Sequence, residues 1–241
     1  MKTRIFNCFT ILMVAIVSVG FVSCDDSDES DNTNNGNTNK GKTRKECLLG
    51  TWNFSANTAS GSEEISITFF ENGTYADHDH KYNNRNIEGY YILSADSITF
   101  IEVQSVNYKY KKSVKILELT DNTLLFEGQN ISYDGIFRGT KERNIDEKTS
   151  ERFRKDIIGD WILGTDVLSI KDNGNFEYTE YYKNRSHVYK GVYDICDDKI
   201  LLFEETQKCG ICGLYVIKMI SGDKLVMEGK YELSIPNKNS I

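Results

Sequence analysis

Residues 158–178 read IGDWILGTDVLSIKDNGNFEY, and the same order of landmarks occurs over 49–75 in LGTWNFSANTASGSEEISITFFENGTY. Both stretches open on a Gly-x-Trp motif, which ends at Trp52 in the first and Trp161 in the second. Alternating apolar residues follow, which is the period-2 pattern of a half-buried strand. An Asn-Gly pair comes next, as a type I′ hairpin turn prefers. The sequence therefore predicts two copies of one strand-rich pattern.

The repeat continues beyond these two stretches. Gly89-Tyr90-Tyr91 is matched about a hundred residues later by Gly191-Val192-Tyr193. Landmarks in the same order predict two homologous domains, residues 47–144 and 153–235, with a short helix over 148–156 between them. Each domain is expected to be a meander of about eight antiparallel strands, closed into a small barrel because closure removes exposed edges. The predicted fold class is all-β, with two barrels in tandem.

The N-terminus has the pattern of a secretion signal. Lys2 and Arg4 precede an apolar run over 11–22, which is too short to span a bilayer core of about 30 Å as a helix. We interpret residues 1–23 as a signal peptide. The run ends at Cys24, and this junction resembles the lipobox of bacterial lipoproteins. That resemblance implies acylation of Cys24, a membrane partner and an address at the outer membrane of the cell envelope.

Residues 24–46 are predicted to be a solvated tether, because no apolar residue occurs from 25 to 46. The acidic run over 25–31 is similar to the surface-export signal of Bacteroidota-type lipoproteins, and a plain charged spacer is the alternative. The whole chain has a formal net charge of −7, which argues against a nucleic-acid partner.

The Gly-x-Trp motif at the start of a strand meander resembles the lipocalin-like superfamily. More narrowly, the chain is similar to tandem lipocalin-like domains of Bacteroidota-type lipoproteins. The resemblance implies that Gly50 and Trp52, like Gly159 and Trp161, close one end of each barrel. It also implies that a basic residue of the last strand packs over the tryptophan, a role assigned to Arg138 in the first copy.

The cysteines of the second copy form a candidate disulfide. Cys209 and Cys212 have the spacing of a redox dithiol or of half a zinc site, but a second such pair is missing from the sequence. In an oxidising compartment, a structural disulfide among Cys196, Cys209 and Cys212 is expected. Free thiols and a metal or redox role are the alternatives. We expect no metal ion and no cofactor.

Catalytic patterns are missing from the sequence. The chain has three histidines and contains no Gly-x-Ser-x-Gly motif and no phosphate-binding loop. An enzyme is therefore not expected.

Four tyrosines crowd one predicted hairpin: Tyr178, Tyr181, Tyr182 and Tyr189. Aromatic faces of this kind stack on sugars or hold a partner protein, although ordinary strand composition would also explain them. The sequence predicts a non-catalytic lipoprotein that binds a small apolar or glycan ligand. The alternative is an adhesin or accessory subunit that docks on another surface protein.

Overall fold

The computed structural model of the chain describes residues 42–58, 61–79, 86–105, 108–128, 135–142, 147–206, 209–222, 224–229, 232–235 and 237–238. The predicted signal peptide, Cys24 and the tether up to residue 41 lie outside these residues. Within them, no helix is both long enough and apolar enough to cross a membrane.

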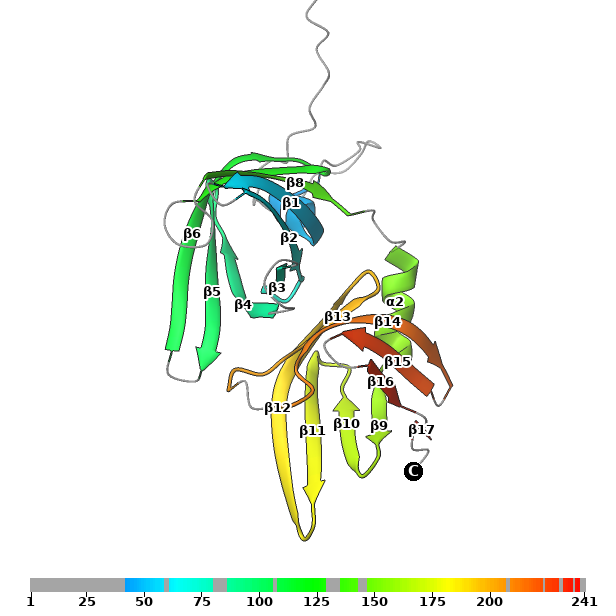
Figure 1. Cartoon of the computed structure of the whole chain (residues 1–241). Helices are drawn as coiled ribbons and strands as arrows, with labels where there is room; N and C mark the ends of the chain where they lie inside the picture. Colours follow the sequence, from blue (N-terminus) through cyan, green and yellow to red (C-terminus); the bar gives the residue numbers. More distant parts are fainter. Residues whose placement is uncertain are drawn as a thin grey trace, which may run out of the picture.

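The first domain is a closed barrel of eight antiparallel strands (Figure 1). It is preceded by helix α1 (Arg44–Leu48), which begins inside the segment predicted as tether. Thr43 and Glu46 explain this start, because their side chains cap each other's backbone N–H groups. Strand β8 closes the barrel by pairing with both β7 and β1. The strands are β1 (Gly50–Thr58), β2 (Gly61–Phe69), β3 (Thr74–Asp79), β4 (Asn86–Leu93), β5 (Ser97–Ser105), β6 (Tyr108–Leu119), β7 (Thr123–Gly128) and β8 (Gly135–Lys141).

The second domain is a curled antiparallel sheet of nine strands that follows helix α2 (Glu147–Asp156). Strand β16 pairs with β15, and β17 pairs with β9, so the end of the chain joins the two edges of the sheet. The predicted all-β fold with two meander barrels and a connecting helix is confirmed. The strands are β9 (Gly159–Leu163), β10 (Asp166–Ile170), β11 (Asn175–Tyr182), β12 (Arg185–Cys196), β13 (Lys199–Phe203), β14 (Gly213–Ser221), β15 (Lys224–Gly229), β16 (Glu232–Ile235) and β17 (Asn237–Lys238).

Both tryptophans hold the same position in their domains. The indole N–H of Trp52 donates to the carbonyl of Leu48 at 2.7 Å, and that of Trp161 donates to Ile157, also at 2.7 Å. Both side chains are fully buried. Each indole thus ties the first strand of its domain to the helical segment before it, which closes that end of the domain.

The turn after the second strand differs in type from the prediction. Phe70 and Thr74 face each other across a three-residue loop, and the N–H of Gly73 donates to the carbonyl of Phe70 at 3.2 Å. Gly73 has a φ of 83°, whereas Asn72 does not have a positive φ. A type I′ turn needs positive φ at both central residues, so the turn is of the glycine-bulge type instead.

The basic residue over Trp52 is Lys141, and the assignment of Arg138 is wrong. Lys141 pairs with Trp52 in the β1–β8 ladder, and its Nζ lies 5.1 Å from the centre of the indole ring system. The same Nζ donates to a carbonyl of α1 at 2.8 Å. Arg138 is exposed because it alternates with inward-facing neighbours on β8. In the second domain, Lys238 takes the same register position opposite Trp161.

The two domains have separate cores and share a third apolar cluster where they meet. Phe70, Ala76 and Val103 of the first domain pack there against Leu201 and Phe203 of the second. The first domain also presents the ring of Tyr90, edge-on to Phe203 at 5.1 Å between centroids. These outward-facing side chains are buried only because the domains dock.

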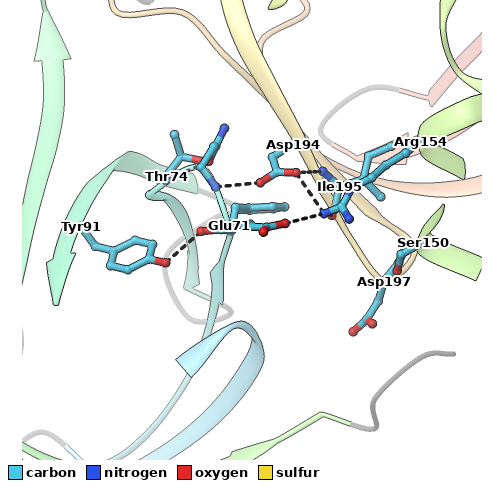
Figure 2. Close-up of polar contacts among 10 residues, drawn as sticks. Glu71, Thr74, Tyr91, Ser150, Arg154, Asp194, Ile195 and Asp197 are labelled. Atoms are coloured by element: carbon cyan, nitrogen blue, oxygen red, sulfur yellow. Dashed lines mark hydrogen bonds and ion pairs between the residues drawn. The ribbon is translucent and has the colours of Figure 1, made fainter. Parts of the chain in front are cut away.

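Polar contacts surround this cluster (Figure 2). Asp194 of β12 accepts the backbone N–H of Asn72 at 2.9 Å. Arg154 of α2 lies 3.3 Å from Asp194 and 3.6 Å from Glu71, so it bridges the two domains. The helix predicted as a linker is therefore also part of the contact between the domains.

The apolar side chains that the first domain contributes to the contact between the domains are not repeated in the second copy. The residues that correspond to Phe70 and Ala76 in the second copy are Lys171 and Glu177, which form an ion pair at 2.8 Å. Lys190 lies 3.1 Å from the same carboxylate. The duplicated surface is thus apolar where it is covered and charged where it faces water.

We expect the docking of the domains to weaken in acid. The Tyr90 hydroxyl donates to Glu205 at 2.9 Å, and Lys109 lies 3.3 Å from the same oxygen. These contacts lower the pKa of Glu205 below its usual 4.5, the Tyr90 hydrogen bond most strongly. A lowered native pKa stabilises the docked state above about pH 4.5, and this contribution is lost as the pH falls through the lowered value.

This expectation is checked by the unfolding free energy between pH 6 and pH 3, measured for the wild type and for Glu205→Gln. The acid slope should be shallower in the variant, because its side chain does not titrate. Equal slopes would contradict the role of Glu205.

Candidate functional site

The hairpin of β11 and β12 extends beyond the rest of the second domain (Figure 1). Strand β10 pairs with β11 only over 167–170, and β13 pairs with β12 only over 192–196. Within the described ladders, residues 180–182 and 185–187 consequently pair only with each other, and residues 188–191 pair with β11 but not with β13. They form a two-stranded ribbon at the mouth of the barrel, on the side opposite α2.

One face of this ribbon continues the inner face of the barrel. Tyr178 is buried in the core, and strand alternation places Glu180 and Tyr182 on the same side. Tyr189 pairs with Tyr178 across the hairpin, and their rings stack at 6.1 Å between centroids. His187 meets the Tyr189 ring edge-on at 4.4 Å. The inner face therefore carries a row of aromatic rings from the core to the tip.

Carboxylates accompany these rings. Asp166 accepts the hydroxyl of Tyr178 at 2.7 Å and the backbone N–H of Tyr181 at 2.9 Å. Glu180 accepts the hydroxyl of Tyr189 at 3.4 Å. Burial, followed by the hydrogen bond to Asp166, raises the pKa of Tyr178, so this phenol stays protonated. The row thus combines flat apolar faces with hydrogen-bonding groups that face the same space.

The structure separates the four predicted tyrosines. Tyr178, Tyr182 and Tyr189 share the inner face, and Tyr182 is 70% exposed. Tyr181 points to the opposite face, where it is 50% exposed next to Val188 at 46%. The four tyrosines therefore lie on two faces of the ribbon, and the contact of each with a ligand stays a prediction. Alternation along the strand could have shown the two faces from the sequence.

Sequence reasoning missed Asp166, Glu180 and His187. Glu180 and His187 lie at even spacings from Tyr178 and Tyr189, so the same alternation would have found them. Asp166 lies on the neighbouring strand, and its position depends on the β10–β11 register. Its only local signal is its place at the start of an alternating run, which is weak.

A loop after β13 forms a wall of the same mouth. Strand β13 runs back from the closed end towards the ribbon end, so residues 204–206 and 209–212 lie at the mouth. Glu204 is only 5% exposed, and its carboxylate accepts the backbone N–H groups of Thr206 at 3.0 Å and of Cys209 at 3.4 Å. The hydroxyl of Tyr215 donates to the carbonyl of Ile211 at 2.8 Å. These bonds attach the loop to the core.

The predicted disulfide among Cys196, Cys209 and Cys212 is not formed in this structure, where all three are free thiols. Cys196 ends β12 beside Lys199, which places it at the opposite end of β13 from the other two. Burial raises the pKa of Cys196 to about 12. The three cysteines therefore do not form one cluster.

Other kinds of site were sought in the rest of the described chain. Within the described residues, no group of three His, Cys, Asp or Glu side chains could hold a metal ion. A cavity of about 480 Å³ opens beside α1 of the first domain, lined by Arg44, Asp96, Glu118 and neighbouring residues of β6. None of the predicted site residues lines it.

Comparison with known proteins gives little further information. No protein-family model matches the sequence, and no curated protein matches it. A solved structure of a lipocalin-like protein from Bacteroides uniformis matches with 21% identity and a TM-score of 0.30. The match covers 40% of this chain and 99% of that one.

Proposed function

We propose that the chain is a non-catalytic, lipid-anchored protein of the cell envelope, whose second barrel binds a glycan at its mouth. The observation that carries the proposal is the inner face of the β11–β12 ribbon, where Tyr182, Tyr189 and His187 extend the aromatic lining out of the core. The signal-peptide pattern and Cys24 support the address. The overall negative charge supports a ligand other than nucleic acid.

A glycan suits this mouth better than a small apolar molecule. Large aromatic side chains already fill the cores, so an apolar ligand would have to displace them. Sugars present apolar faces that stack on rings and hydroxyls that donate to carboxylates such as Asp166 and Glu180. The core aromatics are Trp52, Phe54, Phe69, Tyr75, Tyr91, Phe100, Phe126 and Phe137 in the first domain, and Phe153, Trp161, Phe176, Tyr178, Tyr193 and Tyr215 in the second.

Binding to an array of neutral oligosaccharides tests this proposal. We expect Tyr182→Ala and Tyr189→Ala each to weaken binding about fivefold, because each removes a stacking face worth about 1 kcal/mol. Tyr181→Ala is the matched control, since it deletes an exposed ring from the outer face of the same ribbon. If the wild type binds no member of the array, or if all three variants bind like the wild type, the glycan proposal fails.

The outer face of the ribbon favours a second candidate, a partner protein. Tyr181 and Val188 are exposed there next to strand edges that have no partner in the described ladders, and such edges accept a further strand. This function predicts the reverse pattern: Tyr181→Ala would reduce the capture of a surface protein, whereas Tyr189→Ala would leave it unchanged.

A further inference from the structure

Cys209 and Cys212 are placed to react with each other. They bracket a tight turn in which the N–H of Cys212 donates to the carbonyl of Cys209 at 3.2 Å. The two thiols also adjoin, because each shifts the pKa of the other, that of Cys209 downward and that of Cys212 upward. A disulfide needs Cα atoms within about 7 Å, and a turn of this kind satisfies that requirement.

The other described cysteines are out of reach. Cys196 pairs with Lys199, and Lys199 pairs with Val216 on β14. Val216 is four residues along the chain from Cys212, or about 13 Å in an extended strand. Cys47 belongs to the core of the first domain. The geometry therefore selects one pair from the several that the sequence left open.

The two thiols of the pair differ in their surroundings. The hydrogen bond from Cys212 lowers the pKa of Cys209, and the backbone N–H groups of Ile211 and Cys212 act in the same direction. Burial and the negative charge of Glu204 oppose this effect. Thiolates are the reactive form, so exchange begins when one thiol of the pair loses its proton.

We propose that Cys209 and Cys212 form a reversible dithiol–disulfide couple, closed by exchange with a disulfide-bonded thiol compound, and that Cys196 takes no part in it. The thiolate of one cysteine attacks one sulfur of the donor R–S–S–R, forms a mixed disulfide and releases the first thiolate RS⁻. The thiolate of the other cysteine then attacks the sulfur of the first cysteine and releases the second RS⁻. In sum, one donor disulfide is reduced to two RSH as the two cysteines are oxidised.

Closing this couple fixes the wall of the barrel mouth. The turn lies between Glu204, which binds the N–H of Cys209, and Tyr215, which binds the carbonyl of Ile211. Cys209 and Ile211 also pack in the core cluster that contains Tyr178. A covalent bond across the turn would hold these contacts together. The inference stands whether or not the mouth binds a glycan.

Equilibration of the purified protein in buffers of reduced and oxidised glutathione tests the proposal. Free thiols are then alkylated in acid-quenched, denatured samples, and the masses of the tryptic peptides are measured by mass spectrometry. Cleavage after lysine places Cys209 and Cys212 together in peptide 209–218 and Cys196 alone in peptide 191–199. We expect peptide 209–218 to change from doubly alkylated to unalkylated, and two hydrogen atoms lighter, as the buffer becomes oxidising. Peptide 191–199 should stay alkylated throughout.

Single substitutions provide the controls. Cys196→Ser should leave the transition of peptide 209–218 unchanged. Cys212→Ser should stop the reaction at the mixed disulfide, so that Cys209 carries one glutathione. A peptide 209–218 that remains doubly alkylated under every condition would overturn the proposal, as would a disulfide that contains Cys196.

Discussion

Cys24→Ala is expected to move the protein from the detergent-extracted membrane fraction to the soluble fraction. Each acyl methylene that leaves water contributes about 0.8 kcal/mol, and a single chain gives only reversible binding. The proposed anchor attaches several acyl chains at Cys24, so losing the attachment site would remove essentially all of the membrane affinity. Cell fractionation of the wild type and the variant measures the change.

The matched control is Cys196→Ala, which removes a cysteine from the second barrel and should leave the protein in the membrane fraction. Membrane association that survives Cys24→Ala would contradict the anchor.

Neutralising the acidic run over 25–31 tests whether this run is an export signal or a charged spacer. An export signal predicts that the protein becomes inaccessible to protease on intact cells, whereas a charged spacer predicts no change.

The features that the sequence predicted correctly depend on local patterns. Alternation and turn residues set the strands, and a repeated order of landmarks reveals two domains before any contact is known. The strands around Ile67 and Leu168 were identified in this way, as was the helix that carries Phe153. The spacing of apolar side chains in these segments is visible in the sequence without any knowledge of which strands pair.

The features that the sequence did not predict depend on pairing between distant strands. Lys141 lies over Trp52 because of the register between β1 and β8. These are the first and last strands of the domain, so the register joins residues that are far apart in the sequence. Arg138 is only three residues away, but it faces outward. The separation of Cys196 from Cys212 has the same origin, since it follows from the β12–β13–β14 ladder.

The docking face between the domains had a local signal that was overlooked. Residues 200–203 read ILLF, an unbroken apolar run, while most other strands alternate. Such a run indicates a strand buried on both faces. Ile200 and Leu202 lie in the barrel core, and Leu201 and Phe203 lie in the cluster between the domains. A strand with two apolar faces therefore pointed to a second covering surface.

Phe203→Asp is consequently expected to uncouple the two barrels. Phe203 is 1% exposed, and it faces the first domain rather than the core of its own. An unpaired carboxylate at this position would cost about 3–5 kcal/mol if it stayed buried. The domains can avoid that cost by separating, because each keeps its own core. We expect the thermal unfolding of the wild type to be a single transition and that of the variant to split into two, with a larger radius of gyration before unfolding.

The matched control for this change is Ile92→Asp. Ile92 lies on β4, two residues from Tyr90 of the docking face, but it is 53% exposed. The same type of substitution there should leave both the single transition and the radius unchanged, since the added carboxylate stays in water. If Phe203→Asp also behaves in this way, the contact between the domains does not couple their unfolding. If both variants unfold in two steps, added charge on its own weakens the docking, and the apolar cluster is not what holds the barrels together.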